Sequence, residues 1–286
     1  MSAVSHTSTG GNGHRAEEGD GLTVALMSAK GSPGVTTAAV GLAARWPSAG
    51  AVVLEADPAG GDLAARFNRH FDPGLSAMAL DSRAGNAGLE PGRWLQQLPC
   101  GGNAVLAPPG PAVAASLVEL GPRTSQVLAA LAAQHRVVLV DAGRWQPDSA
   151  AEAVVSAADV LLILARPMLD DLRQLEVRLP ALRALSGDVR LLLRGNDGWP
   201  PDEVAASLGV PVVGTLPTDH DGASVLSGRS VPRRGWASTA WTRLPLLRAC
   251  RSLVAALSES RPGSRPSTAR FGAFTRPERI APAGTS

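Results

Sequence analysis

A series of short apolar runs constrains this chain more than any other feature of its sequence. In most of them every residue is apolar, so that a strand built from the run has two apolar faces and is buried on both sides. The runs that predict strands are 22–27, 51–54, 104–107, 137–141, 160–165, 189–193 and 210–213. Segments with helical spacing alternate with them, at 35–46, 124–134, 148–157, 169–185, 203–208 and 244–257. This alternation predicts an α/β fold: a mostly parallel, doubly wound sheet flanked by helices, in a single domain.

The two ends of the chain differ in composition from the middle. Residues 1–20 are almost free of apolar side chains, and we expect a flexible leader there. Residues 260–286 are rich in Pro, Gly, Ser and Arg, which predicts a disordered basic tail. The expected domain is therefore 21–259, and within it the Gly- and Pro-punctuated stretch 73–101 predicts no element.

Composition excludes several classes of protein. Two cysteines exclude a disulfide framework or a cysteine-built zinc site, and the five histidines lack the spacing of metal ligands. No apolar run reaches the ~18 residues of a membrane helix, so we expect no integral membrane segment. The polar start lacks the apolar core of a signal peptide, and we expect a cytoplasmic protein.

The basic residues are almost all arginine. Of 27 basic side chains, Lys30 is the one lysine. Arginine and lysine differ in shape and hydration, so we expect this lysine at a place where a planar guanidinium does not fit. Chance survival in a chain biased towards arginine is the alternative.

Lys30 belongs to a turn that suits a phosphate group. The segment 29–37 reads AKGSPGVTT and joins the first strand to the first helix. Small residues here let successive N–H groups converge at a helix N-terminus, where an anion is favoured. The common phosphate loop is G-x-x-x-x-G-K-[ST], and this chain has Ala29 and Val35 at its first glycine and its lysine. From the loop alone, a turn without a ligand is an equal alternative.

The loop and four later segments together resemble the MinD/ParA family of P-loop ATPases, which have a deviant Walker A loop, K-G-G-x-G-K-T-T. Lys30 falls on the signature lysine of that loop. The later segments occur in the family's order at 55–62 (EADPAGGD), 137–141 (VVLVD), 158–164 (ADVLLIL) and 208–219 (LGVPVVGTLPTD). The resemblance covers residues 22–258, and the branch stays open between partitioning proteins and CpaE/TadZ-like relatives.

The resemblance implies ATP and Mg²⁺ as cofactors and gives several residues a role. Gly31, Gly34, Val35, Thr36 and Thr37 would line the phosphates, with Thr36 on Mg²⁺ and Thr37 on the α-phosphate. Asp57 and Lys30 would be catalytic, with Asp57 near the metal and the attacking water, and Asp141 would hold Mg²⁺ through its water shell. Arg194 and Asn196 match loosely where the family contacts adenine, and Pro217 lies in the last family segment.

Each of these roles has a plainer structural alternative. For Gly31 and Gly34 the alternative to phosphate contact is a tight turn. For Thr36 or Thr37 it is capping of the first helix, and for Asp57 it is capping of the next helix. For Asp141 we favour the ligand role, because a carboxylate at the end of a buried strand is costly unless it is paired. Asp159 we expect to be structural.

Two departures from the family pattern weaken the expected catalysis. Val35 replaces the loop lysine that neutralises the phosphates, and Glu55 replaces the first aspartate of the D-x-D pair. Phosphoryl transfer depends on positioning and on charge stabilisation, so we expect weak or absent hydrolysis, and the sequence leaves open whether the chain is an enzyme. Backbone donors, Mg²⁺ and Lys30 remain for binding.

Positive charge is concentrated towards the C-terminus. Residues 1–221 have a net charge of −7, and residues 222–286 one of +9. The segment 222–258 has arginines but no acid, with Trp236 and Trp241 among them. This charge favours nonspecific binding to DNA or to another anionic surface, and an ordinary terminal helix with a solvated basic face is the alternative.

These features support two functions. One is an ATP-binding protein that forms a nucleotide-dependent homodimer and acts in spatial positioning, either in chromosome or plasmid partitioning or in localising a pilus or secretion apparatus. The other is a pseudo-ATPase scaffold that keeps the fold without turnover. A metabolic enzyme of the wider fold class has no supporting motif in the sequence.

Restoring the loop lysine is the most direct test of the loop. We expect Val35→Lys to tighten ATP binding about 10- to 150-fold, the range for one charge-assisted contact of about 1.5–3 kcal/mol. Titration calorimetry with Mg-ATP measures the change. An unchanged affinity would mean that the loop does not face phosphates.

Overall fold

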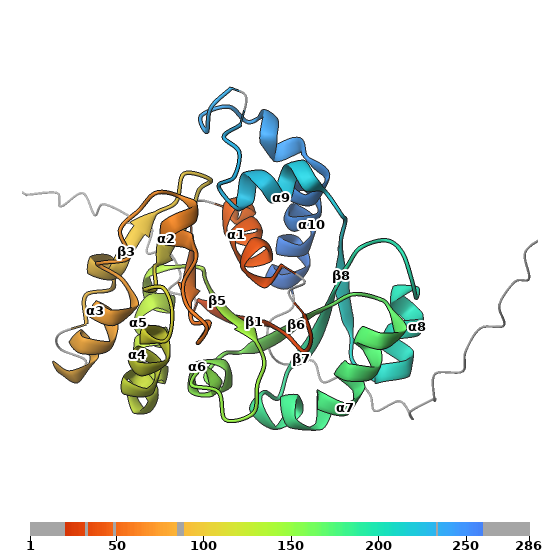
Figure 1. The fold of residues 1–286 in the computed structure, drawn as a ribbon, viewed down its shortest axis with the longest axis horizontal. Coiled ribbons are helices and arrows are strands. Elements are labelled where there is room, and N and C mark those ends of the chain that lie inside the picture. The colour runs from red at the N-terminus through yellow and green to blue at the C-terminus, as the bar shows by residue number, and fades with distance from the viewer. Residues whose placement is uncertain (1–20, 32–33, 48–49, 85–88, 233, 260–286) are drawn as a thin grey trace, which may run out of the picture.

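The computed structural model describes residues 21–31, 34–47, 50–84, 89–232 and 234–259. The expected leader (1–20) and tail (260–286) lie outside the described residues. The described chain forms one eight-stranded sheet with helices on both faces, the doubly wound α/β arrangement that the sequence predicts (Figure 1).

The sheet has the strand order β3-β4-β2-β5-β1-β6-β7-β8. Neighbouring strands are parallel except for β3 and β4, which pair antiparallel at one edge. The strands are β1 (Leu22–Ser28), β2 (Ala51–Glu55), β3 (Leu95–Gln97), β4 (Asn103–Val105), β5 (Val137–Arg144), β6 (Val160–Ala165), β7 (Val189–Arg194) and β8 (Val212–Leu216).

The apolar residues of β1 face two separate cores. Ala25 and Met27 pack on one side of the sheet, and Val24 and Leu26 on the other, all of them buried. This arrangement is the reason for the unbroken apolar run, because a central parallel strand is covered on both faces.

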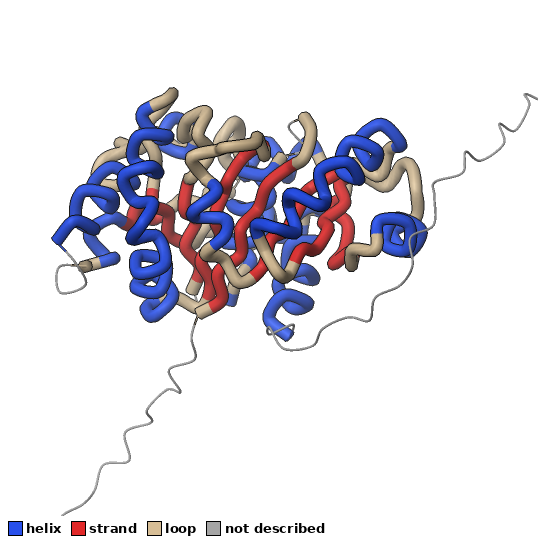
Figure 2. The backbone as a smooth tube through the Cα atoms, turned by 90° about the horizontal axis from the view of Figure 1, so that it is seen from below, coloured by secondary structure: helices blue, strands red, loops and turns tan. Residues whose placement is uncertain are grey.

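The helices form one layer on each face (Figures 1 and 2). The first layer packs on the face of Val24 and contains α1 (Val35–Arg45), α2 (Leu63–Arg66), α9 (His220–Leu226) and α10 (Pro245–Glu259). The second layer contains α3 (Leu75–Asp81), α4 (Ala112–Leu120), α5 (Thr124–Gln134), α6 (Glu152–Ser156), α7 (Leu169–Leu185) and α8 (Pro201–Leu208). Short 3-10 helices lie at Ser82–Ala84, Pro91–Trp94, Gly121–Arg123 and Ala240–Arg243.

Several elements differ in extent from the expectation, and others were not expected. The segment 73–101 forms α3 and β3, and α4 and α9 were not expected. The last strand is β8 at Val212–Leu216 rather than 210–213, because an irregularity in its pairing with β7 lets it continue through Gly214. The helix expected at 148–157 is shorter, at Glu152–Ser156.

The terminal helix α10 packs directly on α1, and the contact depends on a glycine. A Cβ atom on Gly41 would lie 2.8 Å from Cys250 Sγ and 3.0 Å from Leu226 Cδ1. Both neighbours are fully buried, and Cys250 is a free thiol. The two helices therefore approach as closely as a glycine permits.

We expect Gly41→Ala to lower the free energy of unfolding by about 1–3 kcal/mol, because overpacking outweighs the gain of about 1 kcal/mol in helix propensity. The double variant Gly41→Ala/Cys250→Ala should recover part of this loss, because it removes the sulfur from the contact. Urea unfolding of the two single variants and the double variant measures the coupling. Additive effects would contradict the close approach.

Candidate functional site

The candidate site lies where the parallel strands end. The register places Leu26 of β1 and Glu55 of β2 on either side of Asp141 in β5. The loop after β1 therefore starts beside the carboxyl end of β5. In open α/β sheets, ligands bind at this carboxyl edge.

The loop leads into a helix N-terminus that no side chain of a described residue caps. Gly31 and Gly34 have φ angles of 70° and 92°, a left-handed conformation that a glycine adopts without strain. Gly34 is the N-cap of α1, and no capping hydrogen bond comes from a side chain in the described part of the loop. The alternative in which Thr36 or Thr37 caps α1 is therefore wrong. The first N–H groups of α1 remain available to an anion.

Thr36 and Asp141 come together at the start of α1. The Thr36 side chain makes a hydrogen bond with the Asp141 carboxyl group, which also accepts one from the Gly143 N–H at 3.2 Å. Asp141 is only 2% exposed. Burial is the main cause that raises its pKa to about 7; the nearby carboxylates of Glu55 and Asp57 add to the rise, and the Thr36 hydrogen bond opposes it.

This pair fits a metal ion that arrives with a nucleotide. Among the described residues, no group of three His, Cys, Asp or Glu side chains gathers to hold a metal by itself. Mg²⁺, however, is usually bound by one or two protein oxygens together with phosphates and water. A threonine hydroxyl and a buried carboxylate with a raised pKa suit that role, since a bound cation would favour the charged form of Asp141.

Glu55 has a structural role that the sequence did not predict. Its Oε1 accepts hydrogen bonds from the N–H groups of Asp62 and Leu63, both at 2.8 Å, and its Oε2 accepts one from Ala107 at 2.9 Å. The carboxyl group is 3% exposed, and burial raises its pKa. Glu55 thus holds the N–H groups at the start of α2 and ties them to the segment after β4; an unpaired buried carboxylate here would be costly.

Asp57 lies against the end of β5 and does not cap a helix. Its Oδ1 accepts a hydrogen bond from the Ala59 N–H at 2.9 Å. Gly143 has a φ of 63°, and a Cβ atom there would overlap the Asp57 carboxylate. Burial raises the pKa of Asp57. The helix-capping alternative for Asp57 is wrong, since Glu55 takes that place, and its role near a metal and water stays a prediction.

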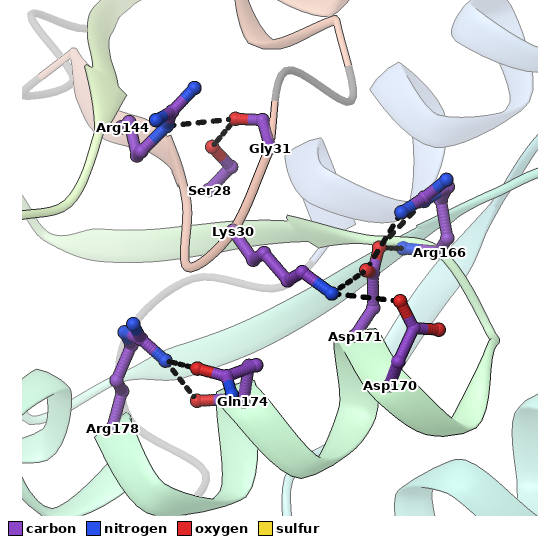
Figure 3. Close-up of polar contacts among 9 residues, drawn as sticks. All are labelled: Ser28, Lys30, Gly31, Arg144, Arg166, Asp170, Asp171, Gln174 and Arg178. Carbon is purple, nitrogen blue, oxygen red and sulfur yellow. Dashed lines mark hydrogen bonds and ion pairs between the residues drawn. The ribbon is translucent and has the colours of Figure 1, made fainter.

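The two positions that carry lysine in the family pattern differ sharply here. Val35 is 6% exposed and belongs to the apolar core on the α1 side of the sheet. Lys30 Nζ lies 2.7 Å from Asp170 Oδ2 and 3.5 Å from Asp171 Oδ1, at the N-terminus of α7 (Figure 3). The Asp170 hydrogen bond raises the pKa of Lys30. The Lys30 ammonium group is therefore paired with the start of α7 of the same chain.

Asp171 is itself fixed by an arginine. Its carboxylate is buried and accepts two hydrogen bonds from Arg166, from Nε at 2.7 Å and from Nη2 at 2.9 Å. This bidentate pair holds the start of α7 in the place where Lys30 meets it.

The residues expected near the nucleoside lie in two neighbouring places. Asn196 is exposed and Pro217 half-buried, and their loops lie together because the Gly195 N–H donates to the Leu216 carbonyl at 2.8 Å. Thr37 lines a separate pocket of about 370 Å³ between α1, α2 and α9. Its other lining residues are Arg66, His220, Ala223, Ser224, Ser227 and Arg229. The structure does not bring Asn196 into this pocket.

Asp159 is structural, as expected. Its Oδ2 accepts a hydrogen bond from the Thr23 N–H at 2.8 Å at the start of β1. Asp219 accepts hydrogen bonds from Gly222 N and Leu246 N, both at 2.9 Å, and so joins the starts of α9 and α10. Asp219, which ends the last family segment, therefore acts as a structural cap.

Arg144 was not identified from the sequence. It ends β5, and its Nε donates a hydrogen bond to the Gly31 carbonyl at 3.1 Å. No motif marks this residue, because its place beside the loop depends on the register that pairs it with Ser28.

The basic C-terminal segment is a partly exposed surface. Arg248 and Arg251 are exposed on α10 beside a shallow hollow of about 480 Å³, while Leu247 and Val254 are buried, as the helical spacing predicts. The tryptophans pack inward: Trp236 stacks edge-on with Trp241 at 5.6 Å and with Phe67 at 6.3 Å. They do not present an open platform for bases.

Comparison with solved structures identifies the fold. The cell division ATPase MinD from Pyrococcus furiosus superposes with a TM-score of 0.63 at 14% identity, over 84% of this chain and 99% of that one. A ParA family ATPase from Chlorobium tepidum gives 0.64 at 18% identity, over 83% and 98%. The chain has the MinD/ParA fold.

A third similar structure with this fold holds a nucleotide. The septum site-determining protein MinD from Pyrococcus horikoshii, solved with Mg-ADP, superposes with a TM-score of 0.63 at 13% identity, over 82% of this chain and 95% of that one. No family model and no curated protein sequence matches the chain. At these identities the likeness establishes the MinD/ParA fold alone.

The raised pKa of Asp141 predicts a pH-dependent stability in the absence of metal. The folded state keeps this proton to about pH 7, whereas the unfolded state loses it near pH 4. The stability from the protonated carboxyl group is therefore complete below pH 4 and is lost as the pH rises through 7.

Asparagine at this position has no proton to lose in this pH range, so Asp141→Asn should not lose stability as the pH rises. Between pH 5 and pH 7 we expect its free energy of unfolding to rise relative to wild type by about 2–3 kcal/mol. Urea unfolding in the presence of a chelator, at several pH values, measures the difference. Parallel profiles for the two proteins would show that Asp141 titrates normally in the fold.

Proposed function

We propose that this protein binds ATP with Mg²⁺ at the loop 30–37, forms a nucleotide-dependent homodimer and acts in spatial positioning, with weak or no hydrolysis. The observation that carries the proposal is the hydrogen-bonded pair of Thr36 and Asp141 beneath the uncapped N-terminus of α1. An anion site and an oxygen pair for a cation stand next to each other, as a metal-bound phosphate requires.

The roles of the other residues follow from this arrangement. Gly31 and Gly34 admit the phosphate chain, Thr37 meets the α-phosphate, and Asn196 and Pro217 border the nucleoside. Bound Mg²⁺ would neutralise phosphate charge, with Thr36 and Asp141 holding it and Asp57 orienting water beside it. The Mg-ADP complex of the Pyrococcus horikoshii protein supports the choice of ligand.

Weak turnover follows from the position of Val35. The side chain packs in the core, so α1 supplies no cation to the charge that develops on the phosphates. Transition-state charge needs preorganised partners, and losing one such group typically costs two to three orders of magnitude in rate. We propose that binding survives while hydrolysis is slow.

The buried Val35 also favours a second function, a pseudo-ATPase scaffold that keeps the fold for protein contacts. In that case the ion pair of Lys30 with Asp170 is the permanent state of the loop. ATP binding and turnover, measured on one preparation, separate the two functions.

The helices and the exposed surface of the described chain support the proposed location and partners. None of the helices in the described part of the chain is long and apolar enough to cross a membrane. The exposed arginines of α10 support contact with an anionic surface, such as the phosphates of DNA. We propose a cytoplasmic protein, with partitioning or localisation of a pilus or secretion apparatus as its task.

We expect calorimetry to detect ATP binding that depends on Mg²⁺, with a turnover near background in the same sample. Thr36→Val, which removes the hydroxyl but keeps the shape, should abolish the dependence on Mg²⁺. Thr242→Val is a matched control, because its hydroxyl binds only the Thr239 carbonyl near α10. If wild type shows neither heat nor a thermal shift at millimolar Mg-ATP, the scaffold function holds.

Lys30→Arg tests the proposed homodimer. We expect it to weaken ATP-dependent association, because a planar five-donor group does not fit where a compact ammonium must reach the partner's phosphate. The melting temperature should stay the same, since an exposed ion pair such as Lys30–Asp170 adds little to stability.

Sedimentation with ATP, with ADP and without nucleotide measures the association. Equal ATP-dependent dimerisation of both proteins, or none in wild type, would remove Lys30 from the site.

A further inference from the structure

The phosphate loop lacks a cation from its own segment. Val35 is buried in the core, and Lys30 extends away from the loop to Asp170 on α7 (Figure 3). The nearby side chains of Asp57 and Asp141 are acidic. A bound triphosphate would therefore meet negative side chains and backbone donors, with no positive group from the loop.

Arg144 lies on the opposite side of this loop from Lys30 (Figure 3). Its position is fixed by the sheet, because β5 pairs with β1 and places Arg144 beside Ser28. The Trp145 N–H continues this pairing with a hydrogen bond to the Ser28 carbonyl at 2.9 Å. The arginine is thus held at the end of a rigid strand.

The guanidinium group is anchored at one nitrogen and open at the others. Nε donates to the Gly31 carbonyl, which also accepts a hydrogen bond from Ser28 Oγ at 3.4 Å. Neither terminal nitrogen of Arg144 has a hydrogen bond or an ion pair with another described residue, and the side chain is exposed. A fork of free N–H donors matches the geometry of a phosphate group.

The charge of Arg144 acts on the site as it stands. Burial raises the pKa of Asp57, and the positive charge of Arg144 opposes this rise. The arginine is therefore close enough to influence the acidic side of the pocket, while its anchor holds it to the loop.

We propose that Arg144 replaces the missing loop lysine, and that its terminal nitrogens bind the phosphate chain of the nucleotide while Nε holds the Gly31 carbonyl. This inference rests on the proposed binding of ATP at the loop. It assigns the positive charge to the strand β5 rather than to the helix α1.

The test compares Mg-ATP affinities by calorimetry. We expect Arg144→Gln to bind about 10- to 150-fold more weakly than wild type, as for the loss of one charge-assisted contact. Arg144→Lys keeps the charge without the fork and should fall between them. Arg93→Gln is the matched control, an exposed arginine beside the edge strand β3 that should leave the affinity unchanged. Melting temperatures confirm that each variant is folded.

A rescue separates a phosphate ligand from a clamp that only shapes the loop. In Arg144→Gln/Val35→Lys the charge returns from the helix, and we expect an affinity close to that of wild type. Weak binding that Val35→Lys does not restore would overturn the inference, because the arginine would then act only through the shape of the loop.

Two other outcomes separate the inference about Arg144 from the proposed function. Wild-type affinity in Arg144→Gln would overturn the inference and leave the proposed function standing. If wild type itself does not bind Mg-ATP, both fail.

Discussion

The pairing of β5 with β1 decides where Asp141 and Arg144 lie relative to the loop after β1. The two strands are parallel and buried between two helical layers, so their register cannot slip without moving apolar residues out of the cores. That register brings Asp141 beside the start of α1 and Arg144 beside the phosphate loop. The chemistry at the edge of the sheet is therefore a consequence of apolar packing at its centre.

Much of this could be predicted from the sequence, because the apolar runs mark buried strands directly. The strands at 22–27, 137–141 and 160–165 and the long helix at 169–185 needed only periodicity, and the order of motifs predicted the fold. The edge of the sheet was harder to predict. Strand β3 has three residues, half-buried or exposed, and leaves no apolar run.

The site itself was only partly predictable. Glycines and threonines of the loop are local in sequence, so their arrangement followed from the pattern. The partners of Glu55, Lys30 and Arg144 are distant in the chain, and each contact depends on how neighbouring strands and helices lie. For Glu55 the sequence indicated a departure from a family pattern, whereas the structure shows a carboxylate occupied by three backbone donors.

The buried thiols of Cys100 and Cys250 give this fold an internal reporter. Both belong to the apolar core between the sheet and the layer of α1 and α10, and burial raises their pKa to about 12, so almost no thiolate forms in the closed protein. Alkylation at either sulfur requires that layer to open, and its rate therefore measures how often the opening occurs. Because Cys250 packs against Gly41 of α1, the same chemistry would report whether a ligand at the N-terminus of α1 steadies the packing at its middle.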